Sequence, residues 1–176
     1  MTEAIKYFKA ACQIDPKFVQ AFDNLGKAYY AKRDFKNAQD AFEKALTIDP
    51  EMTSAQLTLG WVYLLGRAKP EKAARYFLKV LDKDPKSSTA MYGLGLSYLN
   101  DKNRLKVLEV VTKLRQLDKE NLAAQLEDML RHNRYELVPP EELDSPSPSE
   151  DTTQAPPEPP KKSGIKVRLR GKLDRI

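Results

Sequence analysis

One arrangement of apolar and polar residues recurs three times along the chain, with a period of about 34 residues. In each copy a bulky residue precedes a Leu-Gly pair, Tyr follows three positions after the Gly, and the first two copies continue with Ala, Phe and Pro. The aligned sets are Phe22, Leu25, Gly26, Tyr29, Ala38, Phe42 and Pro50; Gln56, Leu59, Gly60, Tyr63, Ala73, Phe77 and Pro85; and Met91, Leu94, Gly95, Tyr98, Val107, Val111 and Lys119. Such a fixed period is typical of stacked supersecondary units, so it argues against most enzyme folds.

Within each copy the apolar positions predict a pair of amphipathic helices. The expected helices span residues 2–14, 18–31, 35–47, 52–65, 70–83, 87–99, 102–117 and 120–132. Asp-Pro pairs at residues 15–16, 49–50 and 84–85 separate the units. We expect each Asp to cap the following helix, with Pro at its first position. Gly26, Gly60 and Gly95 cost about 1 kcal/mol each in an isolated helix, which indicates places where two helices touch closely.

The two ends of the array differ from its middle. The apolar residues of segment 1–14 repeat those found 34 residues later, so this segment is interpreted as the second half of a repeat. The matching residues are Ala4, Phe8, Ala11 and Ile14 against Ala38, Phe42, Ala45 and Ile48. Either the chain is truncated, which we favour, or another subunit covers its open face. At the other end, residues 120–132 have one apolar and one polar face, as a terminal cap requires.

This spacing resembles the tetratricopeptide repeat family over residues 1 to 131. The resemblance implies an all-α fold, a right-handed α-α superhelical solenoid of about three and a half repeats. Its expected parts, within a domain of residues 1–133, are a half repeat (1–14), repeats at 15–48, 49–83 and 84–117, and a cap helix at 120–132. Copy two has one extra residue, which we expect in the turn at 67–70, and copy three lacks the second-half Ala, Phe and Pro.

In the resembled family the inner, concave face is lined by the first helix of each repeat, outside the Leu-Gly-Tyr stripe. The resemblance therefore assigns a partner-binding groove to Lys27, Tyr30, Leu57, Trp61, Leu64, Tyr92, Leu96 and Leu99. A contiguous apolar surface of this kind is typical of interaction sites, and Trp and Tyr are frequent anchors there. The alternative is that the array closes on itself, or that the cap helix covers part of this face.

Some relatives grip the C-terminal carboxylate of chaperones on this same face with Lys, Asn and Arg. The matching positions here are Asp23, Lys27, Thr58, Thr89 and Gly93, and only Lys27 carries a suitable group. Chaperone tails are therefore not expected partners.

Charge is distributed in blocks along the chain, whose formal net charge is +5. Residues 136–160 hold acids and no base, and eight of the 12 prolines lie between Pro139 and Pro160. Residues 134–163 are therefore predicted to be a disordered, acidic, proline-rich linker. The segment at 164–176 is basic and amphipathic, because Ile165, Val167 and Leu169 alternate with Lys166, Arg168 and Arg170. We expect these six residues to dock on a partner as a strand, although a helical stripe also fits.

Candidate chemistry is sparse. His132 lacks neighbours at metal-ligand spacing, Cys12 fits a core thiol position, and no glycine-rich phosphate loop occurs, so we expect no enzyme, no metal and no cofactor. No apolar run reaches the length of about 18 residues that a membrane helix needs. The single cysteine cannot form an internal disulfide, and the first residues form no signal peptide. A cytoplasmic protein is expected, with an upstream segment left open because the chain begins in mid-repeat.

Two functional hypotheses follow. The first is a non-enzymatic adaptor or scaffold that binds a peptide or amphipathic helix of another protein in its groove, within a larger assembly, and adds a tethered docking segment. The second is association with nucleic acid or an anionic membrane through Lys161 to Arg175, which lack aromatic residues for base stacking. The basic residues Lys72, Arg75, Lys79 and Lys83 of helix 70–83 are interpreted as a solvated face.

Overall fold

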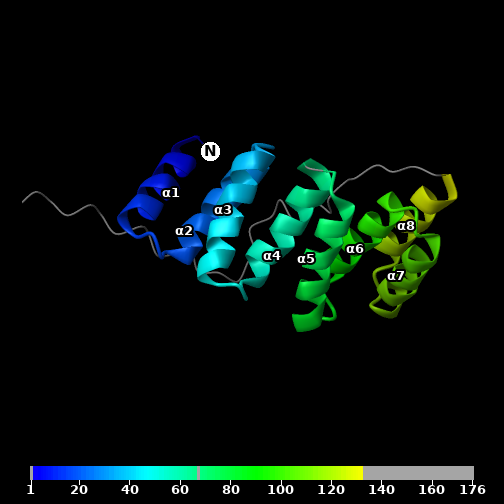
Figure 1. The fold of residues 1–176 in the computed structure, drawn as a ribbon. Helices are drawn as coiled ribbons and strands as arrows, with labels where there is room; N and C mark the ends of the chain where they lie inside the picture. The colour runs from blue at the N-terminus through cyan, green and yellow to red at the C-terminus, as the bar shows by residue number, and fades with distance from the viewer. Residues whose placement is uncertain (1, 67, 133–176) are drawn as a thin grey trace, which may run out of the picture. The chain divides into compact units, whose positions relative to one another are not determined.

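The computed structural model describes residues 2–66 and 68–132, and every regular element in these ranges is helical (Figure 1). The elements are α1 (Thr2–Ile14), α2 (Val19–Ala31), α3 (Phe35–Ile48), α4 (Thr53–Trp61), the π-helical turn η1 (Val62–Gly66), α5 (Pro70–Lys83), α6 (Ser88–Asn100), α7 (Arg104–Gln116) and α8 (Glu120–His132). The eight expected helices are all present, with α4 and η1 together forming the fourth. The period-3.6 pattern was therefore sufficient to locate the helices.

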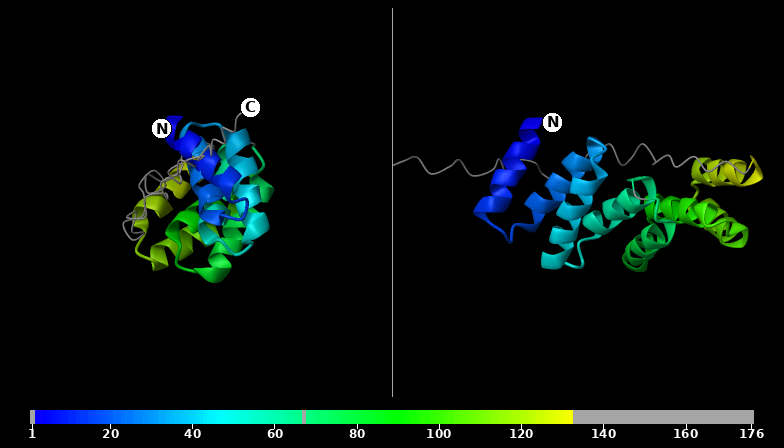
Figure 2. Two further views of the ribbon diagram at one scale, coloured as in Figure 1. Left: turned by 90° about the vertical axis from the view of Figure 1, so that its left-hand side faces the viewer. Right: turned by 45° about the horizontal axis from the view of Figure 1, so that its top comes forward.

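The helices pack in chain order, each against its neighbour in sequence (Figures 1 and 2). The first helices of successive units also contact one another, so α2 packs on α4, α4 on α6, and α6 on α8. The buried apolar side chains form one continuous cluster from Ile5 to Leu130. This is the architecture of an α-solenoid, in which each unit contacts mainly the next.

Phenylalanine rings fill the spaces left by the repeat glycines of the first two copies. A Cβ on Gly26 would lie 2.7 Å from Cε1 of Phe42, and one on Gly60 would lie 2.8 Å from Cε1 of Phe77. Phe77 also approaches the next unit, because a Cβ on Gly93 would lie 2.5 Å from its Cζ. These distances are shorter than any real Cβ contact, so the expected close approach of helices at Gly26 and Gly60 is confirmed.

The Asp-Pro pairs close the turns between units and do not cap helices as expected. Asp49 follows the last residue of α3, its carboxylate accepts a hydrogen bond from the N–H of Glu51 at 3.0 Å, and its carbonyl accepts one from Met52 at 3.3 Å. Asp15 and Asp84 make the matching bonds. Each pair thus occupies the first two positions of a β-turn, where Asp and Pro are both favoured. The expectation of N-cap Asp and first-turn Pro was wrong.

The extra residue of the second copy is absorbed inside a helix. In all three copies the carbonyl of the repeat Tyr accepts the same closing hydrogen bond, from Asp34 to Tyr29, Lys69 to Tyr63 and Asn103 to Tyr98, each at 2.9 Å. The second of these spans one residue more, and the π-helical turn η1 widens the chain there. The insertion was expected at 67–70, but the observed widening lies earlier, at Val62–Gly66.

The two ends of the array differ in how well they are covered. In α1, Ile5 is buried, whereas Tyr7 and Ile14 are 65% and 82% exposed. In α8, Ala123, Leu126 and Leu130 are buried against the preceding helices. Arg115 of α7 holds α8 with two hydrogen bonds of 2.9 Å to the carboxylate of Glu127. Helix α8 therefore has the buried apolar face that the sequence predicted for it.

Candidate functional site

Most of the apolar residues assigned to the inner groove are buried in the core. Five side chains are at most 2% exposed, namely Trp61, Leu64, Tyr92, Leu96 and Leu99. They belong to the same apolar cluster as the repeat phenylalanines. The expectation that they line an exposed surface was therefore wrong.

Trp61 shows why this assignment failed. Its indole contacts the ring of Phe77 edge to face at 5.2 Å between centroids, and the ring of Tyr92 at 6.5 Å. Trp61 thus joins α4 to both α5 and α6. The matching residue of the first unit, Lys27, is exposed, whereas Trp61 is enclosed by one ring of its own unit and one of the next.

The cap helix accounts for part of the cover over α6. The hydroxyl of Tyr92 donates a hydrogen bond to Oε1 of Gln125 in α8 at 2.9 Å. A Cβ on Gly95 would lie 2.5 Å from Cδ1 of Leu126, also in α8. The alternative reading, in which the cap helix covers part of the inner face, is therefore confirmed at Tyr92. Burial raises the pKa of the Tyr92 hydroxyl.

The remaining inner-face residues lie on α2 and α4. Lys27 is exposed, while Tyr30 and Leu57 are partly buried. Beside them Asp23 is only 3% exposed. Its Oδ2 forms an ion pair with Nζ of Lys27 at 2.8 Å and accepts a hydrogen bond from Oγ of Ser54 at 3.3 Å. Its Oδ1 has no hydrogen-bond partner among residues 2–66 and 68–132.

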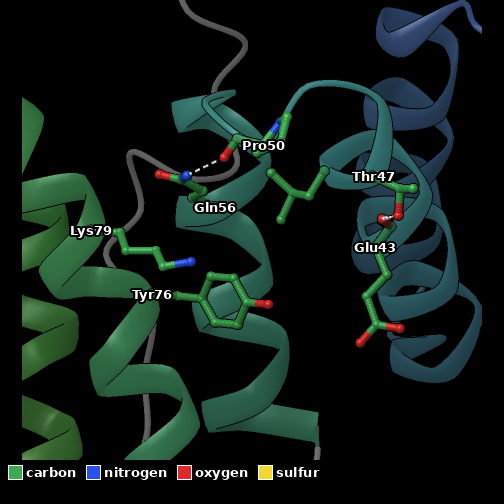
Figure 3. A pocket seen from close by; sticks show the side chains of 7 residues that line it. Glu43, Thr47, Pro50, Gln56, Tyr76 and Lys79 are labelled. Carbon is green, nitrogen blue, oxygen red and sulfur yellow. Dashed lines mark hydrogen bonds between the residues drawn. The ribbon is translucent and has the colours of Figure 1, made fainter.

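A pocket of about 340 Å³ opens on the other side of α4, between α3 and α5 (Figure 3). It is lined by Glu43, Leu46, Thr47, Pro50, Gln56, Tyr76 and Lys79. Gln56 is 2% exposed, and its Nε2 donates to the carbonyl of Pro50 at 2.6 Å. Its Oε1 is buried without a hydrogen-bond partner in the part of the chain that the structure describes.

A second pocket of about 220 Å³ continues from the first along α5. It is lined by Tyr63, Lys72, Arg75, Tyr76 and Lys79, so the two pockets share Tyr76 and Lys79. The rings of Tyr63 and Tyr76 are stacked, 5.6 Å apart and 14° from parallel. Nζ of Lys72 lies 5.4 Å from the centre of the Tyr63 ring, and Nζ of Lys79 lies 5.6 Å from that of Tyr76.

Glu43 is the acidic residue that lines the larger pocket. Its Oε1 accepts hydrogen bonds from the hydroxyl of Tyr63 and from Nε2 of Gln39, each at 2.8 Å. Burial, and then the nearby charge of Glu43, raise the pKa of the Tyr76 hydroxyl. The larger pocket therefore has a carboxylate on its α3 side and the cation of Lys79 on its α5 side.

Sequence reasoning missed this aromatic and basic surface. Lys72, Arg75, Tyr76 and Lys79 stand at helical positions i, i+3, i+4 and i+7, which form one stripe of α5. The stripe was visible in the sequence but was interpreted as a solvated face. What the sequence could not show is that Tyr63 of the preceding helix stacks on it.

Other expected features have different outcomes. The proposed docking residues Ile165 to Arg170 and the basic tail lie outside the described residues, so strand docking and contact with nucleic acid or membrane stay predictions. Across residues 2–66 and 68–132, no group of His, Cys, Asp and Glu has the arrangement of a metal site. In the same ranges no helix is both long and apolar enough to span a bilayer.

Family models match much of the chain. Models described as tetratricopeptide repeat match residues 19–52 and 63–106, and one described as TPR repeat matches residues 1–33.

Curated relatives are much longer proteins. Anaphase-promoting complex subunit 3 of Schizosaccharomyces pombe is 25% identical over 154 residues, 85% of this chain and 23% of the relative. Tetratricopeptide repeat protein 6 of Homo sapiens is 32% identical over 61% of this chain and 21% of its own length. Anaphase-promoting complex subunit CDC16 of Saccharomyces cerevisiae is 31% identical over 69% of this chain and 15% of its own length. The chain thus spans less than a quarter of each of these relatives.

Solved structures show the same fold. MamA from Desulfovibrio magneticus RS-1 aligns with a TM-score of 0.63 at 22% identity, covering 74% of this chain and 84% of that one. A tetratricopeptide repeat protein from Parabacteroides merdae aligns with a TM-score of 0.64 at 19% identity, covering 73% of this chain and 53% of that one. At these identities the likeness concerns the fold alone.

Proposed function

Because this chain belongs to the tetratricopeptide repeat family, we propose that it is a non-enzymatic scaffold that binds a segment of a partner protein along α2 and α4. The family and the fold are those of protein-interaction modules. We also propose which surface of the chain binds the partner segment. It retains Lys27, Tyr30 and Leu57 from the expected groove and omits the five buried side chains.

The observation that carries this choice is the unsatisfied carboxylate oxygen of Asp23. A buried acceptor without a donor costs about 1–3 kcal/mol, so such groups normally have a partner. Because Oδ1 is buried, a bound segment would shift the side chains that cover it, and it can then supply an N–H group or a cation to Oδ1 while the Asp23–Lys27 ion pair stays intact. The Asp23 carboxylate thus calls for a donor or a cation on the partner, whereas a carboxylate clamp binds an anionic partner.

The neighbouring side chains fit the rest of such a segment. Leu57 presents a partly exposed apolar surface one turn from Ser54, and Lys27 is exposed where it pairs with Asp23. An extended peptide or a short amphipathic helix with one apolar and one donor residue matches this arrangement. Two curated relatives are subunits of the anaphase-promoting complex, and we propose a multisubunit assembly as the setting here too. The cytoplasm remains the predicted compartment.

Site-specific photo-cross-linking tests the surface directly. A photoreactive amino acid at position 57 is expected to trap one defined protein in cells of the source, whereas the same group at position 108 on α7 is not. Leu108 is a suitable control because it is apolar and 45% exposed. Lys27→Glu should reduce the adduct at position 57 by about tenfold, since it places two carboxylates side by side. Equal adducts at both positions, or an adduct insensitive to Lys27→Glu, would show that this surface is not the binding site.

A further inference from the structure

The outer side of α5 carries cations that the described part of the fold does not neutralise. We call the side chains of Tyr63, Lys72, Arg75, Tyr76 and Lys79 the tyrosine–lysine surface. Among residues 2–66 and 68–132, neither Lys72, Arg75 nor Lys79 forms an ion pair, whereas the next lysine, Lys83, is paired with Glu51 at 2.6 Å. The surface thus presents cations without an ion pair beside the half-buried ring of Tyr76, which stacks on the buried ring of Tyr63.

The adjoining pocket is lined by a buried hydrogen-bond acceptor that receives no hydrogen bond. Oε1 of Gln56 has no hydrogen-bond partner among the described residues, and the amide orientation is fixed because Nε2 donates to Pro50. Figure 3 shows Gln56, Tyr76 and Lys79 around this pocket. A ligand that carries backbone N–H groups beside carboxylates would meet both demands.

The exposed part of the Tyr76 ring indicates more closely which class of ligand could bind. Flat aromatic surfaces are the usual docking sites for proline-rich segments, whose rings lie against the aromatic face at little conformational cost. Carboxylates on the same segment would pair with Lys72, Arg75 and Lys79, away from Glu43. The surface is therefore complementary to a short peptide that is both acidic and rich in proline.

The chain itself contains such a peptide. Residues 139–146 read Pro-Pro-Glu-Glu-Leu-Asp-Ser-Pro, with acids at Glu141, Glu142 and Asp144 and no base. We propose that these residues bind in cis to the tyrosine–lysine surface, so that the carboxylates pair with the cations of α5 and the prolines lie beside the half-buried ring of Tyr76. The proposal concerns the outer side of α4 and α5 and is independent of the partner surface on α2 and α4.

The connection is long enough for this contact. Helix α8 ends at His132, and α8, α7, α6 and α5 pack in that order. Neighbouring helix axes lie about 8–10 Å apart, so three such steps amount to about 30 Å. The ten residues from 132 to 142 span up to about 34 Å when extended. Because the segment is tethered, its effective concentration at the surface is of millimolar order, which makes a weak contact sufficient.

A labelled peptide and full-length variants test the proposal. The probe is a fluorescent peptide of residues 138–147 with blocked ends, titrated by fluorescence anisotropy into the full chain. In the wild type the tethered segment competes with the probe. The triple variant Glu141→Gln, Glu142→Gln, Asp144→Asn is therefore expected to bind the probe about tenfold more tightly than the wild type.

Charge reversal on α5 is the second part of this binding experiment. In the triple-variant background, Arg75→Glu with Lys79→Glu should weaken probe binding by at least about tenfold. Lys113→Glu with Arg131→Glu changes the net charge equally at exposed positions on α7 and α8 and should leave it unchanged. Equal loss in both pairs would reduce the contact to non-specific attraction and overturn the proposal. So would equal probe affinity of wild type and triple variant, or a difference that appears only at concentrations where light scattering detects a dimer.

Discussion

The indole of Trp61 meets the ring of Phe77 edge to face, with 5.2 Å between centroids and 67° between ring planes. Both side chains are fully buried, and they belong to different helices of one unit. Trp61→Ala is therefore expected to leave a large cavity and to lower the free energy of unfolding by about 3–5 kcal/mol. Urea denaturation followed by circular dichroism measures this change. The control is Leu108→Ala, an exposed position where we expect about 0.5 kcal/mol or less. Similar small changes in both variants would contradict the core role of Trp61.

Two glycines of α6 should respond differently to the same substitution. A Cβ at Gly93 would meet the Phe77 ring at 2.5 Å, and this ring is fully buried between two helices. A Cβ at Gly95 would meet Cδ1 of Leu126 at 2.5 Å, and this branched aliphatic side chain of α8 has more rotamers with which to adjust than a packed ring. Gly93→Ala should therefore destabilise the fold by about 1–3 kcal/mol. Both substitutions gain about 1 kcal/mol of helix propensity in α6, and only for Gly95→Ala should this gain offset most of the strain. We expect Gly93→Ala to have the lower melting temperature of the two variants. A lower melting temperature for Gly95→Ala would refute this prediction.

The helices were predictable because their signal repeats along the chain. Leu59, Gly60 and Tyr63 occupy the same helix positions as their counterparts 34 residues earlier, so local periodicity fixes each helix and its packing stripe. Turn chemistry was less certain. Asp-Pro suits both a helix start and a β-turn, and the competition was decided by hydrogen bonds that only the folded chain shows, such as Met52 to Asp49.

The candidate surfaces depended on features that no repeat pattern contains. The period places Trp61 on a helix face but does not tell how far Phe77 and Tyr92 enclose it. The stack of Tyr63 on Tyr76 joins two helices. The other copies have no aromatic residue at the position of Tyr76, so the shared repeat pattern does not predict this stack. Composition could identify the basic stripe of α5 but not the aromatic partner beside it.

Left-handed backbone at Ala68 predicts a stabilising glycine. Its φ of 48° lies in a region that costs an ordinary residue about 1–2 kcal/mol. Glycine removes this strain but gains entropy in the unfolded state, so Ala68→Gly should be stabilising by about 0.5 kcal/mol net. Ala124→Gly is the matched control, because Ala124 is also exposed but lies inside α8, where glycine costs about 1 kcal/mol. Thermal unfolding should give shifts of opposite sign, and two shifts of the same sign would contradict the assigned backbone conformation.

The hydrogen bond from Tyr92 to Gln125 should make the stability of the array depend on alkaline pH. Burial raises the pKa of the Tyr92 hydroxyl, whereas in the unfolded chain the group titrates near its ordinary value of about 10. The stabilisation linked to this raised pKa is fully present below pH ~10 and is lost as the pH rises through the pKa of the folded state. Tyr92→Phe removes both the hydrogen bond and the titration, so at pH 7 it should cost about 1 kcal/mol. Urea denaturation at pH 7, 10 and 11 should show the wild type and Tyr92→Phe converging as the pH rises. Both proteins contain the same lysines, so the effect of lysine titration on stability cancels in the difference between wild type and Tyr92→Phe. A constant difference across this range would mean that Tyr92 does not titrate with folding and that its contact with α8 is only steric.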